Sequence, residues 1–438
     1  MNLRTAIIII GGGLAGCEAA WQLARRGVTV TLHEMKPSVF SPAHRSVLLA
    51  ELVCSNSLRS SRIESAVGLL KEELRLAGSL IMEAAEATRV PAGTALAVDR
   101  EKFSRYVETK LASSKNISVI RGEVTSVPRN STVIIATGPL TSDILSQDIA
   151  SITGSDYLYF YDAISPVIEA PSINLSKIFW ASRYTAGIEG DYLNCPMTRQ
   201  HYEHFLNELI HAREAPLHHF EDTKCFEGCL PVEVLARRGI DTLRYGPMKP
   251  VGLTVPCTGI RPYAVVQLRK ENRTASLFNM VGFQTKLLWS EQKRIFRLIP
   301  GLENAEFARY GSIHRNTFIN APALLNDALQ LKTHNSIYFA GQITGVEGYV
   351  ESTAMGLLAG LSAASRVMGK SYEPPPDTSA VGALIKYITT SEVDTFQPMN
   401  VTFGLFPPLA ERVHRHKRGE QYAERAVNSF NEWLKNYI

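Results

Sequence analysis

A glycine-rich turn near the start of the chain constrains the fold more than any other feature of the sequence. Residues 6–10 form an apolar run of strand length, and a glycine-rich hexapeptide follows at once: Gly11, Gly12, Gly13, Leu14, Ala15 and Gly16. In the pattern GxGxxG the first glycine permits a tight turn, the second lets a pyrophosphate approach the backbone, and the third lets helix and strand pack closely. The pattern therefore predicts a phosphate-binding turn that opens a helix, whose N-terminus offers free N–H groups.

The second strand of this unit ends in an acid. Residues 17–26 predict a helix, Gly27 ends it, and residues 28–32 predict a strand that finishes at His33 and Glu34. A carboxylate at this place accepts hydrogen bonds from ribose hydroxyls in dinucleotide-binding folds. Because strand, helix, glycines and acid agree, a binding turn is favoured over a glycine-rich turn that holds no ligand.

Two later segments favour FAD as the dinucleotide. A strand over 133–136 runs into a glycine turn, which resembles the second signature of FAD proteins of the glutathione-reductase type. The segment from 339 onward resembles their third contact, where the start of a helix faces the flavin ring. The candidate contacts here are Thr137, Gly138, Gly341, Gln342, Gly345 and Val346. A second GxGxxG does not occur in the sequence, so any nicotinamide reductant is expected to bind only transiently.

The order of the elements predicts an α/β protein with an FAD-binding, Rossmann-like domain of the glutathione-reductase type and an inserted α+β domain. We expect the first part of the FAD-binding domain in residues 1–155 and the inserted domain in 156–325, where short strands and turns replace the earlier pattern. The FAD-binding domain is expected to return in 326–372. A helical appendix is expected in 373–438, after the proline run that breaks the chain.

Composition excludes several classes of protein. Six cysteines in 438 residues, with no CxxC pair, indicate neither a disulfide scaffold nor a zinc site. The longest apolar stretch, residues 6–16, is shorter than the roughly 20 residues of a membrane span, and it lacks a signal peptide's cleavage region. We therefore expect a reduced, cytoplasmic protein with no membrane partner. The net charge of +4 does not require a nucleic-acid partner but permits a basic patch, such as the cluster at 412–418.

Cysteines beside a flavin have three possible roles: dithiol–disulfide exchange, nucleophilic catalysis, or packing as small apolar residues. Cys54 lies in a polar loop, and Cys229 lies between a glycine and a proline-bearing turn, so either site can expose a thiol and lower its pKa. Local chemistry leaves the reactive and the packing role equally open for these two. The cysteines that best fit a packing role are Cys17, Cys195 and Cys257.

Segments along the whole chain resemble the folate- and FAD-dependent tRNA (uracil-5-)-methyltransferases, a branch of the glucose-inhibited-division flavoproteins. They include residues 50–59 (AELVCSNSLR), 226–231 (FEGCLP), 245–253 (YGPMKPVGL), 339–352 (FAGQITGVEGYVES) and 396–404 (FQPMNVTFG). The sequence departs from the family pattern at Lys286, where a histidine is usual, at residues 44–49, and at Cys225, where an aromatic residue is common.

The resemblance implies an enzyme that makes 5-methyluridine at T-loop position 54 of tRNA, with 5,10-methylenetetrahydrofolate as carbon donor and FAD, reduced by NAD(P)H, as reductant. It also implies that the two essential cysteines correspond to Cys54 and Cys229. A thiolate that adds to uracil C6 makes C5 nucleophilic, and we assign this addition to Cys229. We place Cys54 near the flavin, as proton acceptor or as a thiol that protects the one-carbon unit. The expected partner is tRNA, whose uridine would be flipped out of its loop, and no stable protein partner is implied.

Three other functions remain open from the sequence. The same chemistry on a ribosomal RNA uridine needs only different RNA contacts. An FAD-dependent thiol or NAD(P)H oxidoreductase is disfavoured because paired cysteines and a nicotinamide fingerprint are missing. A non-enzymatic FAD-binding RNA scaffold would bind RNA without either thiol. The basic cluster at 412–418 is interpreted either as a solvated helix face or as a contact to phosphate.

Overall fold

A six-stranded sheet forms the centre of the larger part of the molecule. The structure is a computed structural model that describes residues 6–154, 158–183, 190–215, 230–256, 258–411 and 413–437. In spatial order the strands are β16 (Gln330–Leu331), β17 (His334–Phe339), β7 (Val133–Ile135), β1 (Ile7–Ile10), β2 (Val30–Glu34) and β6 (Ile117–Arg121). Every neighbouring pair is parallel except the edge pair β16–β17. The predicted parallel α/β sheet is therefore confirmed.

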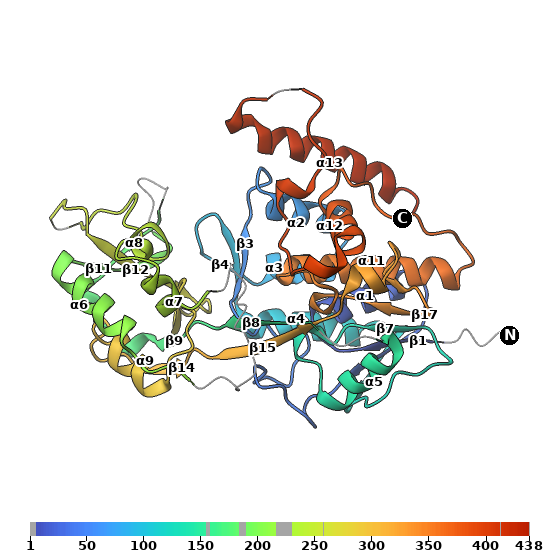
Figure 1. Cartoon of the computed structure of the whole chain (residues 1–438), viewed down its shortest axis with the longest axis horizontal. Coiled ribbons are helices and arrows are strands. Elements are labelled where there is room, and N and C mark those ends of the chain that lie inside the picture. Colours follow the sequence, from blue (N-terminus) through green and yellow to red (C-terminus); the bar gives the residue numbers. More distant parts are fainter. Residues whose placement is uncertain are drawn as a thin grey trace.

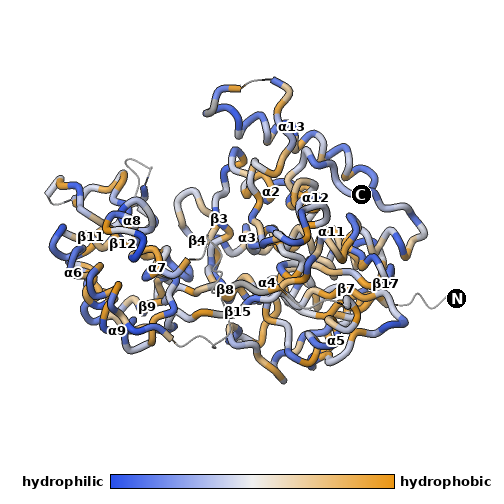
Figure 2. Tube along the Cα trace, in the orientation of Figure 1, coloured by the Kyte–Doolittle hydropathy of each residue, from blue (hydrophilic) through white to orange (hydrophobic). Residues whose placement is uncertain are grey.

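Apolar strands explain why this sheet is parallel and buried. Ile7, Ile9 and the whole of β7 are fully buried, as expected for strands that are covered by helices on both faces. Figure 2 shows hydrophobic residues along the strands around β7 and β17. Their carboxyl ends meet at one edge of the sheet, which is where an open α/β sheet binds its ligands.

The first helix lies close against a helix from the far end of the chain. Helix α1 (Leu14–Arg25) begins earlier than the expected residue 17, because Gly13 already acts as its N-cap and its carbonyl accepts from the Cys17 N–H at 3.0 Å. Helix α11 (Tyr349–Val367) packs on α1 through small residues. A Cβ at Gly356 would lie 2.3 Å from the carbonyl oxygen of Ala15, so only glycine permits this approach.

A second six-stranded sheet, which is antiparallel, forms a separate part of the molecule. In spatial order its strands are β10 (Phe179–Ala181), β11 (Tyr192–Met197), β12 (Ala264–Lys270), β13 (Leu277–Met280), β9 (Val167–Glu169) and β14 (Phe307–Arg309). Its helices are α6 (Arg199–Ile210), α7 (Val232–Arg237), α8 (Thr242–Tyr245) and α9 (Trp289–Phe296). They enclose a hydrophobic core of their own, which contains Phe205, Phe283 and Phe296. The antiparallel pair β8 (Leu158–Ala163) and β15 (Ile313–Phe318) runs between the two parts (Figure 1). The residue limits of the domains stay a prediction.

The remaining elements surround the parallel sheet. A small sheet contains β3 (Ser57–Ser60), β5 (Ala95–Val98) and β4 (Arg89–Val90). The other helices are α2 (Ala66–Leu76), α3 (Leu80–Ala87), α4 (Arg100–Ala112), α5 (Asp143–Thr153), α10 (Ala321–Leu324), α12 (Ala380–Thr390) and α13 (Arg418–Leu434). Helix α13 lies against α2 (Figure 1). Its residues Ala426, Phe430 and Trp433 are buried in the core of the larger part. Among the described residues, no helix is both long and apolar enough to cross a membrane.

Candidate functional site

The glycine-rich turn forms a cradle at the carboxyl end of β1. Gly11 has φ +109°, and a Cβ there would lie 2.4 Å from the carbonyl oxygen of Ala136. A Cβ at Gly16 would lie 1.9 Å from the carbonyl oxygen of Gly11. Gly13 differs, because a Cβ there would meet nothing within 4 Å. Two of the glycines are thus required by protein packing, whereas Gly13 leaves open the space that a pyrophosphate needs at the N-terminus of α1.

The acid at the end of β2 lies beside this cradle. Glu34 is buried, its Oε2 accepts from the Gly12 N–H at 2.9 Å, and its Oε1 accepts from the Lys36 N–H at 3.0 Å. These two donors hold the carboxylate at the mouth of the cradle. Each oxygen keeps a further lone pair that can accept from a hydroxyl, which is the contact that a nucleotide ribose makes.

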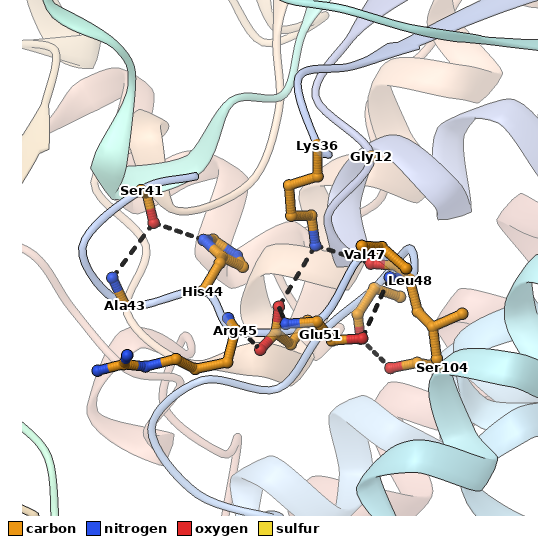
Figure 3. A network of polar contacts seen from close by, with 12 residues as sticks. Gly12, Lys36, Ser41, Ala43, His44, Arg45, Val47, Leu48, Glu51 and Ser104 are labelled. Carbon is orange, nitrogen blue, oxygen red and sulfur yellow. Dashed lines mark hydrogen bonds and ion pairs between the residues drawn. The ribbon is translucent and has the colours of Figure 1, made fainter. Parts of the chain in front are cut away.

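A polar network braces the loop that follows Glu34 (Figure 3). Lys36 Nζ donates to the Leu48 carbonyl at 2.7 Å and pairs with Glu51 at 3.4 Å. The Ser41 hydroxyl lies 2.6 Å from His44 Nδ1. Burial, together with the charge of Lys36, lowers the pKa of His44, so the imidazole is neutral at pH 7. The loop is therefore held in one shape on the side of the cavity where the adenosine end would lie.

The cradle opens into a first cavity of about 1050 Å³. Its wall includes most of the residues predicted to contact FAD, namely Gly11, Gly12, Gly13, Leu14, Ala15, Glu34, Thr137, Gly138, Gly341 and Gln342. The exceptions are Gly16, which packs behind the turn, and Gly345 and Val346. A Cβ at Gly345 would lie 2.4 Å from the ring of Phe396, and Val346 is fully buried.

Sequence reasoning missed part of this wall. Residues 122–124, which follow β6, and Tyr349 at the start of α11 also line the first cavity. Residues 122–124 could have been predicted from the sequence, because they follow a strand of the parallel sheet and the carboxyl ends of parallel strands meet at the same edge. The phenol of Tyr349 had no such signal, since the residues that it contacts lie almost 300 positions earlier in the chain.

A second cavity, of about 1320 Å³, adjoins the first. Both walls include Val53, Pro139, Leu140, Gln342 and Tyr349. The second cavity is also lined by residues of the antiparallel sheet, among them Arg269 and Asn279, and by Cys54. A planar ring held at the shared wall would therefore face a space that both parts of the molecule enclose.

The loop that carries Cys54 is tied to α11. The N–H groups of Cys54 and Ser55 donate to the Tyr349 hydroxyl oxygen at 2.7 and 3.1 Å. Burial raises the pKa of Tyr349, so the phenol stays neutral. The half-buried Cys54 is thus held by its backbone in the wall of the second cavity, next to Val53, which lines both cavities.

Arginines from three elements hold the same loop. Their donations are Arg100 Nη1 to Leu52 O (2.6 Å), Arg309 Nη1 to Val53 O (2.8 Å) and Arg269 Nη2 to Ser55 Oγ (2.8 Å). The carboxylate of Glu271 pairs with Arg100 Nε at 2.6 Å. Burial, and the neighbouring charge of Arg100, lower the pKa of Arg309 to about 10. Positive charge of this kind favours the thiolate form of a nearby cysteine.

The other cysteines divide into two groups. Cys17 and Cys195 are fully buried, and burial raises the pKa of both thiols, which confirms the packing role expected of them. Cys225, Cys229 and Cys257 lie outside the described residues.

Helix α7 begins next to a residue of the second cavity wall. The Val232 N–H donates to the Gln284 carbonyl at 2.7 Å, and Gln284 lines the second cavity. Lys286, where the family pattern has histidine, pairs with Glu214 at 2.8 Å and is not among the described residues that line the cavity.

The basic side chains of the predicted cluster at 412–418 are exposed where the structure describes them. Lys417 and Arg418 lie on the surface at the start of α13, while Arg412 lies outside the described residues. Arg237, at the end of α7, pairs with Glu214 at 2.6 Å. Among the described residues, no group of three or more His, Cys, Asp or Glu side chains is arranged to hold a metal ion.

A parallel sheet with this cradle, acid and third contact defines a dinucleotide-binding protein of the FAD-binding, Rossmann-like class. Comparison with known proteins narrows the class. The family model described as glucose inhibited division protein A matches residues 6–371. The solved structure of Aquifex aeolicus GidA, in its form I crystal, superposes with a TM-score of 0.68 at 17% identity, over 99% of this chain and 77% of that chain.

Curated relatives match over their whole length. The chain is 63% identical to the methylenetetrahydrofolate--tRNA-(uracil-5-)-methyltransferase TrmFO of Syntrophus aciditrophicus, over 99% of this chain and 98% of that protein. It is 58% identical to the protein of the same name from Geobacter sulfurreducens, over 98% of this chain and 99% of that protein. The chain therefore belongs to the glucose inhibited division protein A flavoproteins and, among them, to the methylenetetrahydrofolate--tRNA-(uracil-5-)-methyltransferase family.

Proposed function

We propose that this protein is an FAD-dependent enzyme that methylates C5 of a uridine in tRNA, with 5,10-methylenetetrahydrofolate as carbon donor. The observation that carries the proposal is the pair of adjoining cavities, one with a dinucleotide cradle and the other lined by Cys54. The full-length similarity to methyltransferases of that name supports it. The finer assignments, T-loop position 54, NAD(P)H as the source of electrons and a cytoplasmic location, are part of the proposal.

The first cavity fits FAD by its chemistry. The N–H groups at the start of α1 and the open side of Gly13 would hold the pyrophosphate, and Glu34 would accept from the ribose. Gly341 and Gln342 would lie against the ring, at the wall that the two cavities share. When bound, FAD supplies the electrons that reduce the transferred carbon to a methyl group.

The second cavity would bring folate and the target base together. Uracil C5 is a weak nucleophile, so a thiolate must first add to C6 and move electron density to C5. C5 then bonds to the one-carbon unit, and a base removes the C5 proton as the bond from that carbon to its donor nitrogen breaks. Addition of a hydride to that carbon completes the methyl group, and the C6–S bond breaks as the double bond between C5 and C6 re-forms. We assign the addition to Cys229, which corresponds to one of the two essential cysteines of the family. We assign Cys54 to proton transfer or to protection of the one-carbon unit, in the loop that Arg100, Arg269 and Arg309 hold.

The product of the reaction tests this proposal. The FAD-loaded protein is incubated with an unmodified tRNA transcript, methylenetetrahydrofolate and NADPH, and the nucleosides are analysed by mass spectrometry. We expect 5-methyluridine from the wild type and from Cys195→Ala, whose thiol is buried in the antiparallel sheet. We expect none from Cys54→Ala or Cys229→Ala, while FAD stays bound.

Other results would change the proposal in defined ways. Full activity of Cys54→Ala or Cys229→Ala would remove that residue from the mechanism. Product in ribosomal RNA alone would keep the chemistry and change the substrate. NADPH consumption without any methylated nucleoside would instead indicate a thiol or NAD(P)H oxidoreductase.

A further inference from the structure

One buried amide in the second cavity has no partner for its donor. Asn279 lies on β13, is 3% exposed and lines the second cavity. Its Nδ2 has no hydrogen-bond partner within the part of the chain that the structure describes. A buried N–H₂ group without an acceptor is unfavourable, and native proteins rarely leave one in that state unless it has a function.

The orientation of this amide is fixed by its neighbour. Arg269 is directly opposite Asn279 in the β12–β13 register, and its Nη2 lies 3.5 Å from Asn279 Oδ1. Arginine can only donate, so the atom that faces it must be the amide oxygen, and Nδ2 must point elsewhere. Arg269 itself is held by Ser55 Oγ and Asn56 Oδ1, both at 2.8 Å. The amide is therefore braced against the loop that carries Cys54.

We propose that Asn279 is the residue that reads the carbonyl of a lactam edge, the C4=O and N3–H unit that uracil and the pterin of folate share. Nδ2 donates to the ring C4 carbonyl, and Arg269 is the positioning residue that fixes which end of the amide is the donor. This inference rests on the proposed function, because that function brings both rings into the second cavity. A 4-amino ring presents a donor at the same place, so two donors would face each other and binding would weaken.

Matched ligand pairs test the assignment by binding alone, with the FAD-loaded protein. In one arm folic acid and its 4-amino analogue aminopterin, which differ at C4, are titrated by the change in flavin fluorescence. In the other arm a T-loop RNA hairpin with uridine at the target position is compared with the same hairpin carrying cytidine. Each arm gives a ratio of dissociation constants.

The variant Asn279→Asp keeps the acceptor that faces Arg269 and replaces the donor with an acceptor. In one arm we expect the wild type to bind the ring with the C4 carbonyl with a dissociation constant about tenfold or more lower than that of the 4-amino ring. This is the difference that one buried hydrogen bond makes. We expect this preference to vanish or reverse in Asn279→Asp and to shrink in Asn279→Ala. The control Asn272→Asp makes the same change in the turn after β12, where the side chain bonds to Ser276, and should keep the wild-type ratio.

The arms also identify the ring. A lost preference in the folate arm alone assigns Asn279 to the pterin, a loss in the RNA arm alone assigns it to the uracil, and a loss in both assigns it to both rings in turn. Wild-type ratios in both arms for Asn279→Asp and Asn279→Ala would overturn the proposal. These ratios come from binding and do not depend on catalysis. If the protein fails to methylate RNA, the proposed function is refuted, but the binding ratios can still be interpreted.

Discussion

Replacing Gly13 with alanine separates the folding of the cradle from the binding of its ligand. Gly13 has φ −77° and ψ −170°, a conformation that alanine adopts without strain, and the new Cβ would have no neighbour within 4 Å. Alanine reduces the entropy of the unfolded chain, which stabilises by about 0.4–1 kcal/mol. It is a poorer N-cap than glycine, which costs about the same amount. The free energy of unfolding of the apoprotein should therefore change by less than ~0.5 kcal/mol.

The same methyl group would occupy the space that a pyrophosphate needs. Losing one hydrogen bond to a charged group costs about 1.5–3 kcal/mol, so FAD should bind about 10- to 150-fold more weakly. FAD titration by fluorescence quenching measures this affinity, and thermal unfolding of the apoprotein measures its stability. The matched variant Gly16→Ala, whose Cβ would lie 1.9 Å from the carbonyl oxygen of Gly11, should instead destabilise the apoprotein. Wild-type FAD affinity in Gly13→Ala would refute the reasoning, and so would a loss of apoprotein stability as large as that of Gly16→Ala.

Three further predictions concern the loop, a buried acid and the helix contact. Tyr349→Phe removes the acceptor of two N–H groups, so hydrogen exchange of residues 52–56 should accelerate while FAD stays bound. Burial raises the pKa of Glu73 from 4.5 to about 8. Its contribution to the free energy of unfolding is therefore full below pH 4.5 and is lost as pH rises through 8. Urea unfolding should show that this free energy depends less on pH in Glu73→Gln than in the wild type. Gly356→Ala should lower the free energy of unfolding by about 1–3 kcal/mol, and Gly360→Ala, whose nearest contact would be 3.0 Å, by less.

The cradle was predictable because its residues are neighbours in the sequence. The run 6–10, the glycines and Glu34 each have a local signature, and the structure brings them to one edge of the sheet. The helix after them began earlier than predicted, because Gly13 caps it and residues 14–16 of the glycine-rich turn already form its first turn.

The second cavity was not predictable in the same way. Arg269, Asn279 and Tyr349 reach it from strands and helices that lie hundreds of residues away from Cys54, and polar residues on buried strands resemble ordinary sheet residues in sequence. Arg269 comes close to Cys54 because the antiparallel sheet contacts the loop that carries this cysteine. Gly345 and Val346, chosen because they precede a helix, lie behind the wall of the first cavity, and their contact with FAD stays a prediction.

Trapping the base on the protein tests the central assignment most directly. A T-loop RNA with 5-fluorouridine at the target position is incubated with the FAD-loaded protein and methylenetetrahydrofolate, and the protease-digested complex is analysed by mass spectrometry. Fluorine at C5 cannot leave as a proton does, so the C6–S bond persists after the carbon has been transferred. We expect the nucleotide on the peptide that contains Cys229. A nucleotide bound only to Cys54, or to neither cysteine, would contradict the mechanism.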